Sequence, residues 1–167
     1  MKIRKWYALY TKPRHEFKAL EQITALEIDA YLPTTTVIKQ WSDRKKKITE
    51  PLFKSYIFVN ADESERNLSL TSDAVIKTIF FNGKPAAIPD WEIENLKQML
   101  TNSDKVTVHN GIIKGTLVKI ESGPMMGIEG VVSYVSKDER TLSVSIEMLN
   151  RSVIVNLPSS TVIKKSK

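Results

Sequence analysis

The residues best suited to chemistry in this chain of 167 residues are positively charged, and the chemistry they support is the binding of a polyanion. One group comprises Lys12, Arg14, His15, Lys18 and Gln22. On a helix these side chains can form one polar face beside the helix N-terminus, where free backbone N–H groups attract phosphate. The alternative is an ordinary solvated face, because two glutamates lie within the same stretch.

A second group is a run of four consecutive cations, Arg44, Lys45, Lys46 and Lys47. Adjacent like charges repel one another, so the run is not a device that stabilises a fold. It favours sequence-independent contact with the phosphates of a nucleic acid. The alternative is a loop tip that only adds solubility.

The charge of the whole chain agrees with a polyanionic partner. Lysine and arginine number 25 against 19 acidic residues, which gives a net charge of +6 and an isoelectric point near 9.4. Residues 1–60 carry 12 basic and 6 acidic side chains, so the surplus lies mainly in the first third of the chain. This location favours a nucleic-acid site there.

Catalysis and metal binding find little support in the sequence. The chain has no cysteine, which excludes disulfides, thiol catalysis and cysteine-ligated zinc or iron–sulfur sites. Its two histidines, His15 and His109, are far apart, and the glycine-rich segment 123–130 lacks the Gly-Lys-Ser/Thr ending of a phosphate-binding loop. We therefore expect no enzyme activity, no metal site and no cofactor.

Insertion into a membrane is not expected either. The longest apolar runs are about three to five residues, well short of the roughly 18–20 that a membrane-spanning helix needs. The basic N-terminus is not followed by the apolar core of a signal peptide. The sequence therefore predicts a cytoplasmic protein without a membrane partner.

The first hundred residues alternate strand and helix signals that would position these cations. In chain order the expected elements are a strand at 6–10, a helix at 14–29, a hairpin with strands at 34–40 and 48–50 and its tip at 42–47, a strand at 56–59, a short helix at 62–71, a strand at 75–81 and a helix at 91–100. This order predicts an α+β fold in which helices flank a mostly antiparallel sheet.

The second part of the chain is dominated by short strand and turn signals. Residues 102–115 are polar and contain two glycines, which predicts a linker. The strands expected after it lie at 117–121, 131–135, 142–146, 152–157 and 161–163. Five short strands in about 50 residues predict a small β-barrel.

An aromatic surface is the third candidate feature. Tyr56 and Phe58 alternate to one face of their strand, and Ile57 and Val59 alternate to the other. Because both faces are apolar, one of them can be an exposed binding patch, which Tyr10 would extend. The alternative is that a helix covers this face as well.

Two sets of residues resemble a known family. Lys5-Trp6-Tyr7, the basic helix that follows and Pro51-Leu52-Phe53-Lys54-Ser55-Tyr56-Ile57-Phe58-Val59 resemble the N-terminal (NGN) domain of the NusG family of transcription elongation factors. Val118-Lys119-Ile120, followed by Glu121-Ser122-Gly123-Pro124 and Gly130-Val131-Val132, resembles the KOW module of that family. The resemblance implies an NGN-like domain over residues 1–101, a linker over 102–115 and a five-stranded, SH3-like KOW barrel over 116–167.

Within that family the chain is most similar to specialised paralogues of the RfaH or UpxY kind. The run from Trp6 to Lys12, the run from Glu50 to Phe53 and the compact linker carry this similarity. Lys54-Ser55 replaces the common Pro-Gly or Pro-Asn, and the polar motif that touches the polymerase gate loop in one such paralogue is not reproduced around residues 66–70. The β-branched, alternating residues of the last segment predict a stable barrel rather than the helical hairpin of one paralogue.

The resemblance implies a mechanism without bond chemistry. The NGN-like domain would dock on the clamp helices of the largest catalytic subunit of bacterial RNA polymerase and disfavour the paused state. By position, the polymerase-binding residues would be Tyr10, Phe53, Tyr56, Phe58, Ile93 and Leu96. The residues that contact non-template or upstream DNA would be Lys12, Arg14, His15, Lys18, Gln22, Arg44, Lys45, Lys46, Lys47, Thr71 and Ser72.

The same resemblance implies a protein partner for the barrel, which in relatives is a small-subunit ribosomal protein or a termination factor. Its contacts would be Met125, Met126, Leu149, Asn150 and Arg151. The leading hypothesis is a monomeric antiterminator that suppresses pausing and termination on specific operons. The alternatives are a general NusG elongation factor and a KOW-containing protein that binds the ribosome or its RNA.

Overall fold

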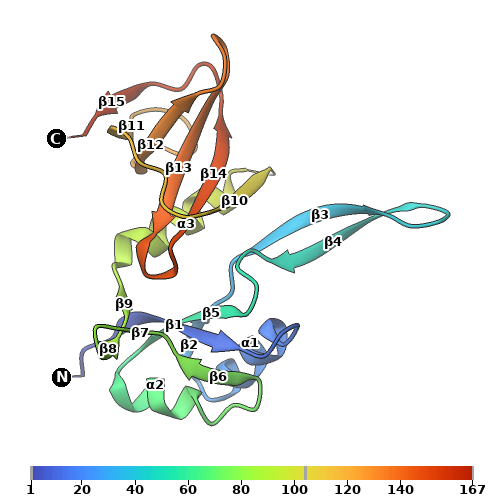
Figure 1. The fold of residues 1–167 in the computed structure, drawn as a ribbon, viewed down its shortest axis with the longest axis vertical. Helices are drawn as coiled ribbons and strands as arrows, with labels where there is room; N and C mark the ends of the chain where they lie inside the picture. Colours follow the sequence, from blue (N-terminus) through green and yellow to red (C-terminus); the bar gives the residue numbers. More distant parts are fainter. Residues whose placement is uncertain (1, 104, 167) are drawn as a thin grey trace. The chain divides into compact units, whose positions relative to one another are not determined.

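A computed structural model describes residues 2–103 and 105–166 of the chain (Figure 1). The contacts between Cα atoms divide the chain into two compact units, Met1–Asp90 and Trp91–Lys167. The sequence predicted a first domain that extends to residue 101, so the division falls earlier than expected. The helix expected at 91–100 therefore belongs to the second unit.

The first unit is built on an antiparallel sheet with the order β2-β5-β1-β6. Its central strands are β1 (Lys5–Thr11) and β5 (Tyr56–Ala61). Short strands lie at both sides, β2 (Asp29–Tyr31) beside β5 and β6 (Val75–Thr78) beside β1. A two-residue strand, β9 (Ala87–Ile88), also pairs with β1. The predicted antiparallel sheet is confirmed.

The register between β1 and β5 decides which side chains share a face. Leu9 lies opposite Ile57, and Ala8 lies opposite Phe58. Because neighbouring residues of a strand point to opposite faces, the first pair lies on one face and the second pair on the other. All four side chains are buried.

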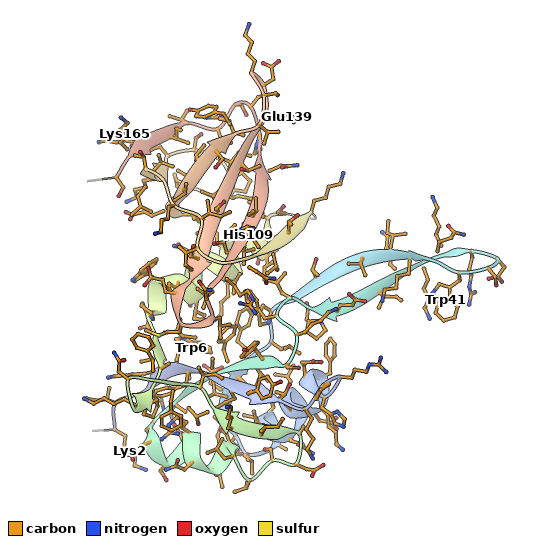
Figure 2. The ribbon with its side chains drawn as sticks, viewed as in Figure 1. Lys2, Trp6, Trp41, His109, Glu139 and Lys165 are labelled. Atoms are coloured by element: carbon orange, nitrogen blue, oxygen red, sulfur yellow. The ribbon has the colours of Figure 1, made fainter. Side chains whose placement is uncertain are left out.

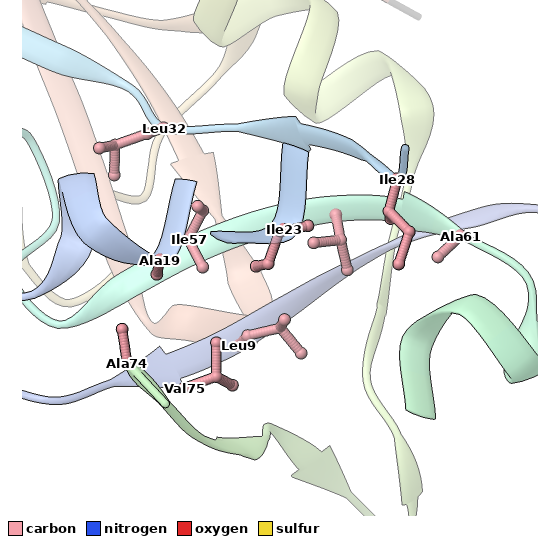
Figure 3. Close-up of a cluster of buried hydrophobic side chains, with 10 residues drawn as sticks. Leu9, Ala19, Ile23, Ile28, Leu32, Ile57, Ala61, Ala74 and Val75 are labelled. Carbon is pink, nitrogen blue, oxygen red and sulfur yellow. The ribbon is translucent and has the colours of Figure 1, made fainter. Parts of the chain in front are cut away.

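Two helices cover the face that carries Leu9 and Ile57. They are α1 (Glu16–Ala25) and α2 (Glu63–Ser69), and both contact β5. The core of this layer consists of Leu9, Ala19, Ile23, Ile28, Leu32, Ile57, Val59, Ala61, Ala74 and Val75 (Figure 3). Full burial of one large aliphatic side chain stabilises a fold by about 1.5–3 kcal/mol, so this cluster holds α1 against the sheet.

The first helix is shorter than the predicted range 14–29. Arg14 has a φ of 64°, in the left-handed region, so the right-handed helix begins only at Glu16. The helix ends at Ala25, and Glu27 then adopts a φ of 60°. A non-glycine residue with a positive φ thus lies just outside each end of the helix. Helical periodicity in the sequence does not reveal such residues.

The second helix confirms the prediction for residues 62–71. It begins with a capping box, in which the Asp62 side chain accepts a hydrogen bond from the Glu65 N–H at 2.8 Å and the Glu65 carboxylate accepts one from the Asp62 N–H at 2.9 Å. Arg66 is buried on the inner side of the helix. Its Nη1 donates to Oγ1 of Thr78 at 3.0 Å, and its guanidinium lies 5.6 Å from the centre of the Tyr7 ring.

A separate two-stranded sheet forms an arm that extends away from the first sheet (Figure 1). Its strands are β3 (Thr34–Gln40) and β4 (Lys45–Pro51). The hairpin is confirmed, but β4 begins three residues before the predicted position 48. Three of the four consecutive cations are therefore strand residues, and only Arg44 belongs to the turn.

The strand predicted at 75–81 is divided into two parts. β6 ends at Thr78, and β7 (Phe80–Phe81) pairs instead with β8 (Lys84–Pro85). Asn82 and Gly83 form the turn between β7 and β8 with φ values of 51° and 75°. Two positive φ values in succession are typical of the tight hairpin turn that an Asn-Gly pair favours.

The second unit begins within α3 (Asp90–Thr101). The first residue of the unit is Trp91, the second residue of this helix. The segment predicted to be a linker contains a strand, β10 (Val106–Asn110). This strand pairs with β14 (Arg151–Leu157) along its whole length. The sequence analysis did not predict this strand, because its pairing partner lies some 45 residues away in the sequence and supplies the hydrogen bonds that order the segment.

The sheet of the second unit is antiparallel and has the order β10-β14-β13-β12-β11-β15. All five strands predicted for it are confirmed, with small shifts at their ends. Their observed bounds are β11 (Leu117–Ile120), β12 (Glu129–Tyr134), β13 (Arg140–Ile146), β14 (Arg151–Leu157) and β15 (Ile163–Lys165). The segment is thus folded as strands and not as a helical hairpin.

A glycine permits the close approach of β12 and β13. A Cβ atom added to Gly130 would lie 2.5 Å from the backbone oxygen of Ser143, a distance that side chains do not tolerate. At Gly115 an added Cβ would instead meet only Cγ1 of Val131, at 2.8 Å, and a side chain can rotate away.

We predict that Gly130→Ala destabilises the second unit by about 1–3 kcal/mol, the usual cost of forcing extra volume into a packed interior. Urea unfolding of the full chain measures the loss. Gly115→Ala is the matched control, and its effect should be clearly smaller. Equal stability of the Gly130 variant and the wild type would show that the two strands separate easily.

Glu92 is an ionisable side chain inside the second unit. It is 2% exposed, and its Oε2 atom has no hydrogen-bond partner among the described residues. Burial, and to a lesser extent the nearby negative charge of Glu147, raise the pKa of its carboxyl group to about 7, while a hydrogen bond from the Glu147 backbone opposes the change. The carboxyl group lines a cavity of about 260 Å³, together with Ser143, whose hydroxyl is also without a partner in the described part of the chain.

We predict that this carboxyl group makes stability depend on pH. Below pH 4.5, its ordinary pKa, Glu92 is protonated in both the folded and the unfolded state, so burial carries no ionisation cost. Above about pH 7 it is ionised in both states, so the wild type should lose about 3 kcal/mol of stability between these limits. Glu92→Gln should remove that loss.

Urea unfolding of both proteins at pH 5 and pH 8 tests the expectation. Glu94→Gln is the control, because Glu94 is an exposed acid on the same helix. A Glu92 variant with the same pH dependence as the wild type would contradict the assigned pKa.

Candidate functional site

The predicted aromatic surface lies at one end of the central strands. Tyr10 and Tyr56 are opposite one another in β1 and β5, and their ring centres are 5.6 Å apart in an edge-to-face arrangement. Both rings are half-buried, so each presents part of its surface to solvent. These two tyrosines are the accessible part of the predicted patch.

The sequence predicted that the phenylalanines of the patch are exposed, but in the structure both are buried. Phe53 is 4% exposed and Phe58 is 0% exposed. Their rings contact edge to face with centres 6.0 Å apart, and Tyr31 stacks on Phe58 at 6.4 Å. Alternation in the strand correctly assigned the face of Phe58 but could not show what covers it.

The other two predicted polymerase contacts, Ile93 and Leu96, lie on α3. Both side chains are fully buried, and both belong to the second compact unit. Their spacing correctly predicted the apolar stripe of a helix. They offer no exposed surface to a partner in this structure.

The cations near α1 are partly neutralised by an acid that the sequence analysis did not identify. Asp73 accepts a hydrogen bond from Nζ of Lys12 at 3.2 Å, and Nζ of Lys18 lies 3.8 Å from its other oxygen. The hydrogen bond from Lys12, and then the charges of both lysines, lower the pKa of the Asp73 carboxyl group. Two cations and one carboxylate leave a single net positive charge at this position.

The remaining residues of this group have different roles. The ring of His15 donates through Nδ1 to the backbone oxygen of Pro13 at 2.8 Å. The side-chain oxygen of Gln22 accepts a hydrogen bond from the Ala74 N–H at 3.0 Å, so this amide ties α1 to the segment before β6. Arg14 and Lys18 are both exposed, but Nζ of Lys18 lies near the carboxylate of Asp73.

The structure brings Thr71 and Ser72 close to this group, because Asp73 follows them directly. Thr71 is exposed, and its hydroxyl donates to the backbone oxygen of Leu68 at 2.7 Å. Ser72 is buried, and its Oγ has no partner among the described residues. Only Thr71 is therefore accessible to a ligand.

Glu16, one of the acids that favoured a solvated face, has a structural role instead. It is buried, and its Oε1 accepts a hydrogen bond from the Ser55 N–H at 3.0 Å. Ser55 has a φ of 67°, and the residue that follows it is Tyr56. This hydrogen bond fixes the turn that delivers Tyr56 to the accessible end of the sheet.

The second cationic group lies on the β3–β4 arm. Arg44, Lys45, Lys46 and Lys47 are all exposed, as predicted. The sequence analysis missed the aromatic residue among them, Trp41, whose ring centre lies 5.2 Å from Nζ of Lys46. A tryptophan three residues before the first of four consecutive cations was a readable signal for this contact.

The predicted partner surface of the second unit is only partly exposed. Met126 and Asn150 are exposed and Arg151 is half-buried, whereas Met125 and Leu149 are buried. Arg151 donates to the backbone oxygens of Leu149 and Asn150 at 3.0 and 3.1 Å. These bonds hold a turn in which Asn150 has a left-handed φ of 51°.

Helix α3 contributes polar contacts to the loop that carries Met125 and Met126. Nε2 of Gln98 donates to the backbone oxygens of Pro124 and Met126 at 3.1 and 2.8 Å. Nδ2 of Asn102 donates to the oxygen of Pro124 at 3.3 Å. These contacts could not be predicted from the sequence, because an amide side chain carries no information about a distant carbonyl.

No group of three or more His, Cys, Asp and Glu residues within 2–103 and 105–166 could hold a metal ion. No helix in the same ranges is long and apolar enough to cross a membrane.

Comparisons with known proteins agree with the architecture. The family model described as NusG, transcription termination factor, matches residues 4–97. The transcription termination/antitermination protein NusG of Haemophilus influenzae is 25% identical over 172 residues, which span 92% of this chain and 90% of that protein. NusG of Yersinia pestis is 26% identical over 140 residues, which span 81% of this chain and 77% of the relative.

A solved structure described as domain interaction in Thermotoga maritima NusG has a TM-score of 0.55 and 23% identity, and it covers 98% of both chains. At this identity the similarity supports the fold alone. The family model, in contrast, spans more than half of the chain, and it matches the region that holds the aromatic and cationic groups. The chain is thus a member of the NusG family of transcription termination/antitermination factors, which are not enzymes.

Proposed function

We propose that this protein is an elongation and antitermination factor that binds the clamp helices of the largest catalytic subunit of bacterial RNA polymerase. It contacts non-template or upstream DNA at the same time and suppresses pausing and termination on specific operons. The observation that carries the proposal is the half-buried Tyr10–Tyr56 pair, which lies at the end of β1 next to the cations around Lys12.

The tyrosine pair is suited to anchor a protein partner. A tyrosine combines a large apolar ring with a hydroxyl group and loses little conformational freedom on binding, and such residues dominate the energetics of interfaces. Here the pair is supported by the buried contact between Phe53 and Phe58 in the same aromatic layer. We therefore assign polymerase docking to Tyr10 and Tyr56, with the phenylalanines as their support.

The contact with DNA depends on two cationic surfaces of different strength. Near α1 the acid Asp73 offsets part of the charge of Lys12 and Lys18, so Arg14 is the strongest anchor for a phosphate there. The exposed cations of the arm, from Arg44 to Lys47, supply the larger share of sequence-independent attraction.

The energetic requirement is modest. A factor that binds the active polymerase tenfold more tightly than the paused polymerase shifts their balance by about 1.4 kcal/mol. One pair of tyrosines and a few phosphate contacts are sufficient for a preference of this size. The second unit would recruit a small-subunit ribosomal protein or a termination factor through Met126, Asn150 and Arg151.

A general elongation factor is the second candidate, because the similarity to Haemophilus influenzae NusG extends over 92% of this chain. Transcription measured across the genome in a deletion strain distinguishes the two roles. Loss of promoter-distal transcription in a few long operons supports the specialised role, and an effect on most operons supports the general one.

We predict that Tyr10→Ala combined with Tyr56→Ala weakens binding to RNA polymerase at least about tenfold, since two interface tyrosines are removed. Pull-down of purified polymerase by tagged full-length protein measures this change. Tyr134→Ala, which alters an exposed tyrosine of the second unit, is the matched control. Equal retention of polymerase by the double variant and the wild type would refute the assigned docking surface.

We also predict that Asp73→Asn strengthens non-specific DNA binding several-fold, because it frees the charges of Lys12 and Lys18. The salt dependence of DNA affinity should become steeper in the variant. Glu27→Gln, which removes an exposed acid at the other end of α1, controls for the change in net charge. An identical gain in both variants would mean that the position of Asp73 has no importance.

A further inference from the structure

Trp41 is an aromatic side chain at the outer end of the β3–β4 arm (Figure 2). The backbone N–H of Trp41 donates to the backbone oxygen of Arg44 at 2.7 Å, which closes the turn over Ser42 and Asp43. The side chain is 48% exposed. A large aromatic ring thus lies on the protein surface beside this turn.

A lysine lies close to this ring on one face of the arm. Lys39 lies opposite Lys46 in the register, and Nζ of Lys46 lies 5.2 Å from the centre of the Trp41 ring. Lys39 also forms an ion pair with Glu50. Because side chains alternate along a strand, Lys45 and Lys47 point to the opposite face, where Ile38 is the exposed apolar residue.

Stability of the arm does not explain the tryptophan. An exposed cation–π contact such as that between Lys46 and Trp41 contributes only about 0.5–1 kcal/mol. Moreover, a smaller residue would satisfy the turn, whose hydrogen bond uses only backbone atoms. The ring and its cations therefore have the composition of a binding surface.

We propose that this face of the arm binds single-stranded nucleic acid, with an unpaired base stacked on the indole of Trp41 and the neighbouring phosphates held by Arg44 and Lys46. Aromatic rings beside cations are the usual means by which proteins bind single strands without regard to sequence. The bases of a duplex are already stacked on one another, so they offer no free face to the indole. The arm therefore prefers single strands to duplexes.

This inference rests on the proposed function, because a transcribing polymerase is what exposes a single strand to such a factor. The displaced DNA strand and the emerging RNA share the required chemistry, an unpaired base between phosphates. DNA and RNA oligonucleotides of the same sequence distinguish these two sources. A preference for either one, or equal binding of both, agrees with the stacking contact.

The test measures the affinity of the full-length protein for labelled oligonucleotides by fluorescence anisotropy. Trp41→Ala should weaken binding of a single strand about 5- to 150-fold, the usual effect of removing one stacking ring. Its affinity for the matching duplex should change less than about twofold, and the salt dependence should stay the same. Lys46→Ala should instead reduce the slope of log affinity against log salt by about 0.7.

Three controls keep the result interpretable. Trp41→Phe preserves a ring and should retain most of the affinity, and Ile38→Ala removes an exposed apolar side chain from the opposite face without effect. Nuclear Overhauser contacts between Thr36 and Thr49, which lie opposite one another in the register, show whether the arm of each variant is intact.

An equal loss of duplex and single-strand affinity in Trp41→Ala, or no loss at all, would overturn the proposal. Polymerase pull-down with the same variants separates this failure from that of the proposed function. Wild-type protein that fails to retain polymerase refutes the proposed function, whereas retention by Trp41→Ala with unchanged strand binding refutes only the stacking contact.

Discussion

The pairing of β1 with β5 is the constraint on which the rest of the first unit depends. It places Leu9 and Ile57 together under α1, and it places Tyr10 beside Tyr56 at the accessible end of the sheet. A shift of one residue would send the aliphatic core to the wrong face and separate the tyrosines. The same hydrogen bonds thus determine both the stability of the layer and the position of the two tyrosine rings.

Much of this arrangement could be predicted from the sequence, because alternation and periodicity report the face on which a side chain lies. The central strands β1 and β5, the arm and the apolar stripe of α3 were found in this way. Burial was harder, since Phe58 and Tyr56 share a face yet only Tyr56 is accessible. What covers a face depends on residues distant in the sequence, and local patterns do not contain that information.

The charged residues show even more clearly that local sequence patterns do not report contacts with distant residues. Lys12 and Lys18 were recognisable as a basic group, but the acid that lies between them comes from a turn more than 50 residues later. The strand β10 was missed for a related reason, although Val106 and Val108 alternate with polar residues as a strand requires. The polar composition of the segment outweighed that weak signal. Only the pairing with β14 shows that the segment is a strand.

Gln98 and Asn102 anchor the loop at Pro124–Met126 solely through its carbonyl oxygens. Main-chain carbonyls are present whatever the side chain, so this attachment places no demand on the identity of the methionines. Residue 126, whose side chain is exposed, is consequently free to vary while the loop keeps its shape. Duplicated copies of such a gene could therefore acquire new protein partners by substitution of one or two exposed residues, without a change in the fold that carries them.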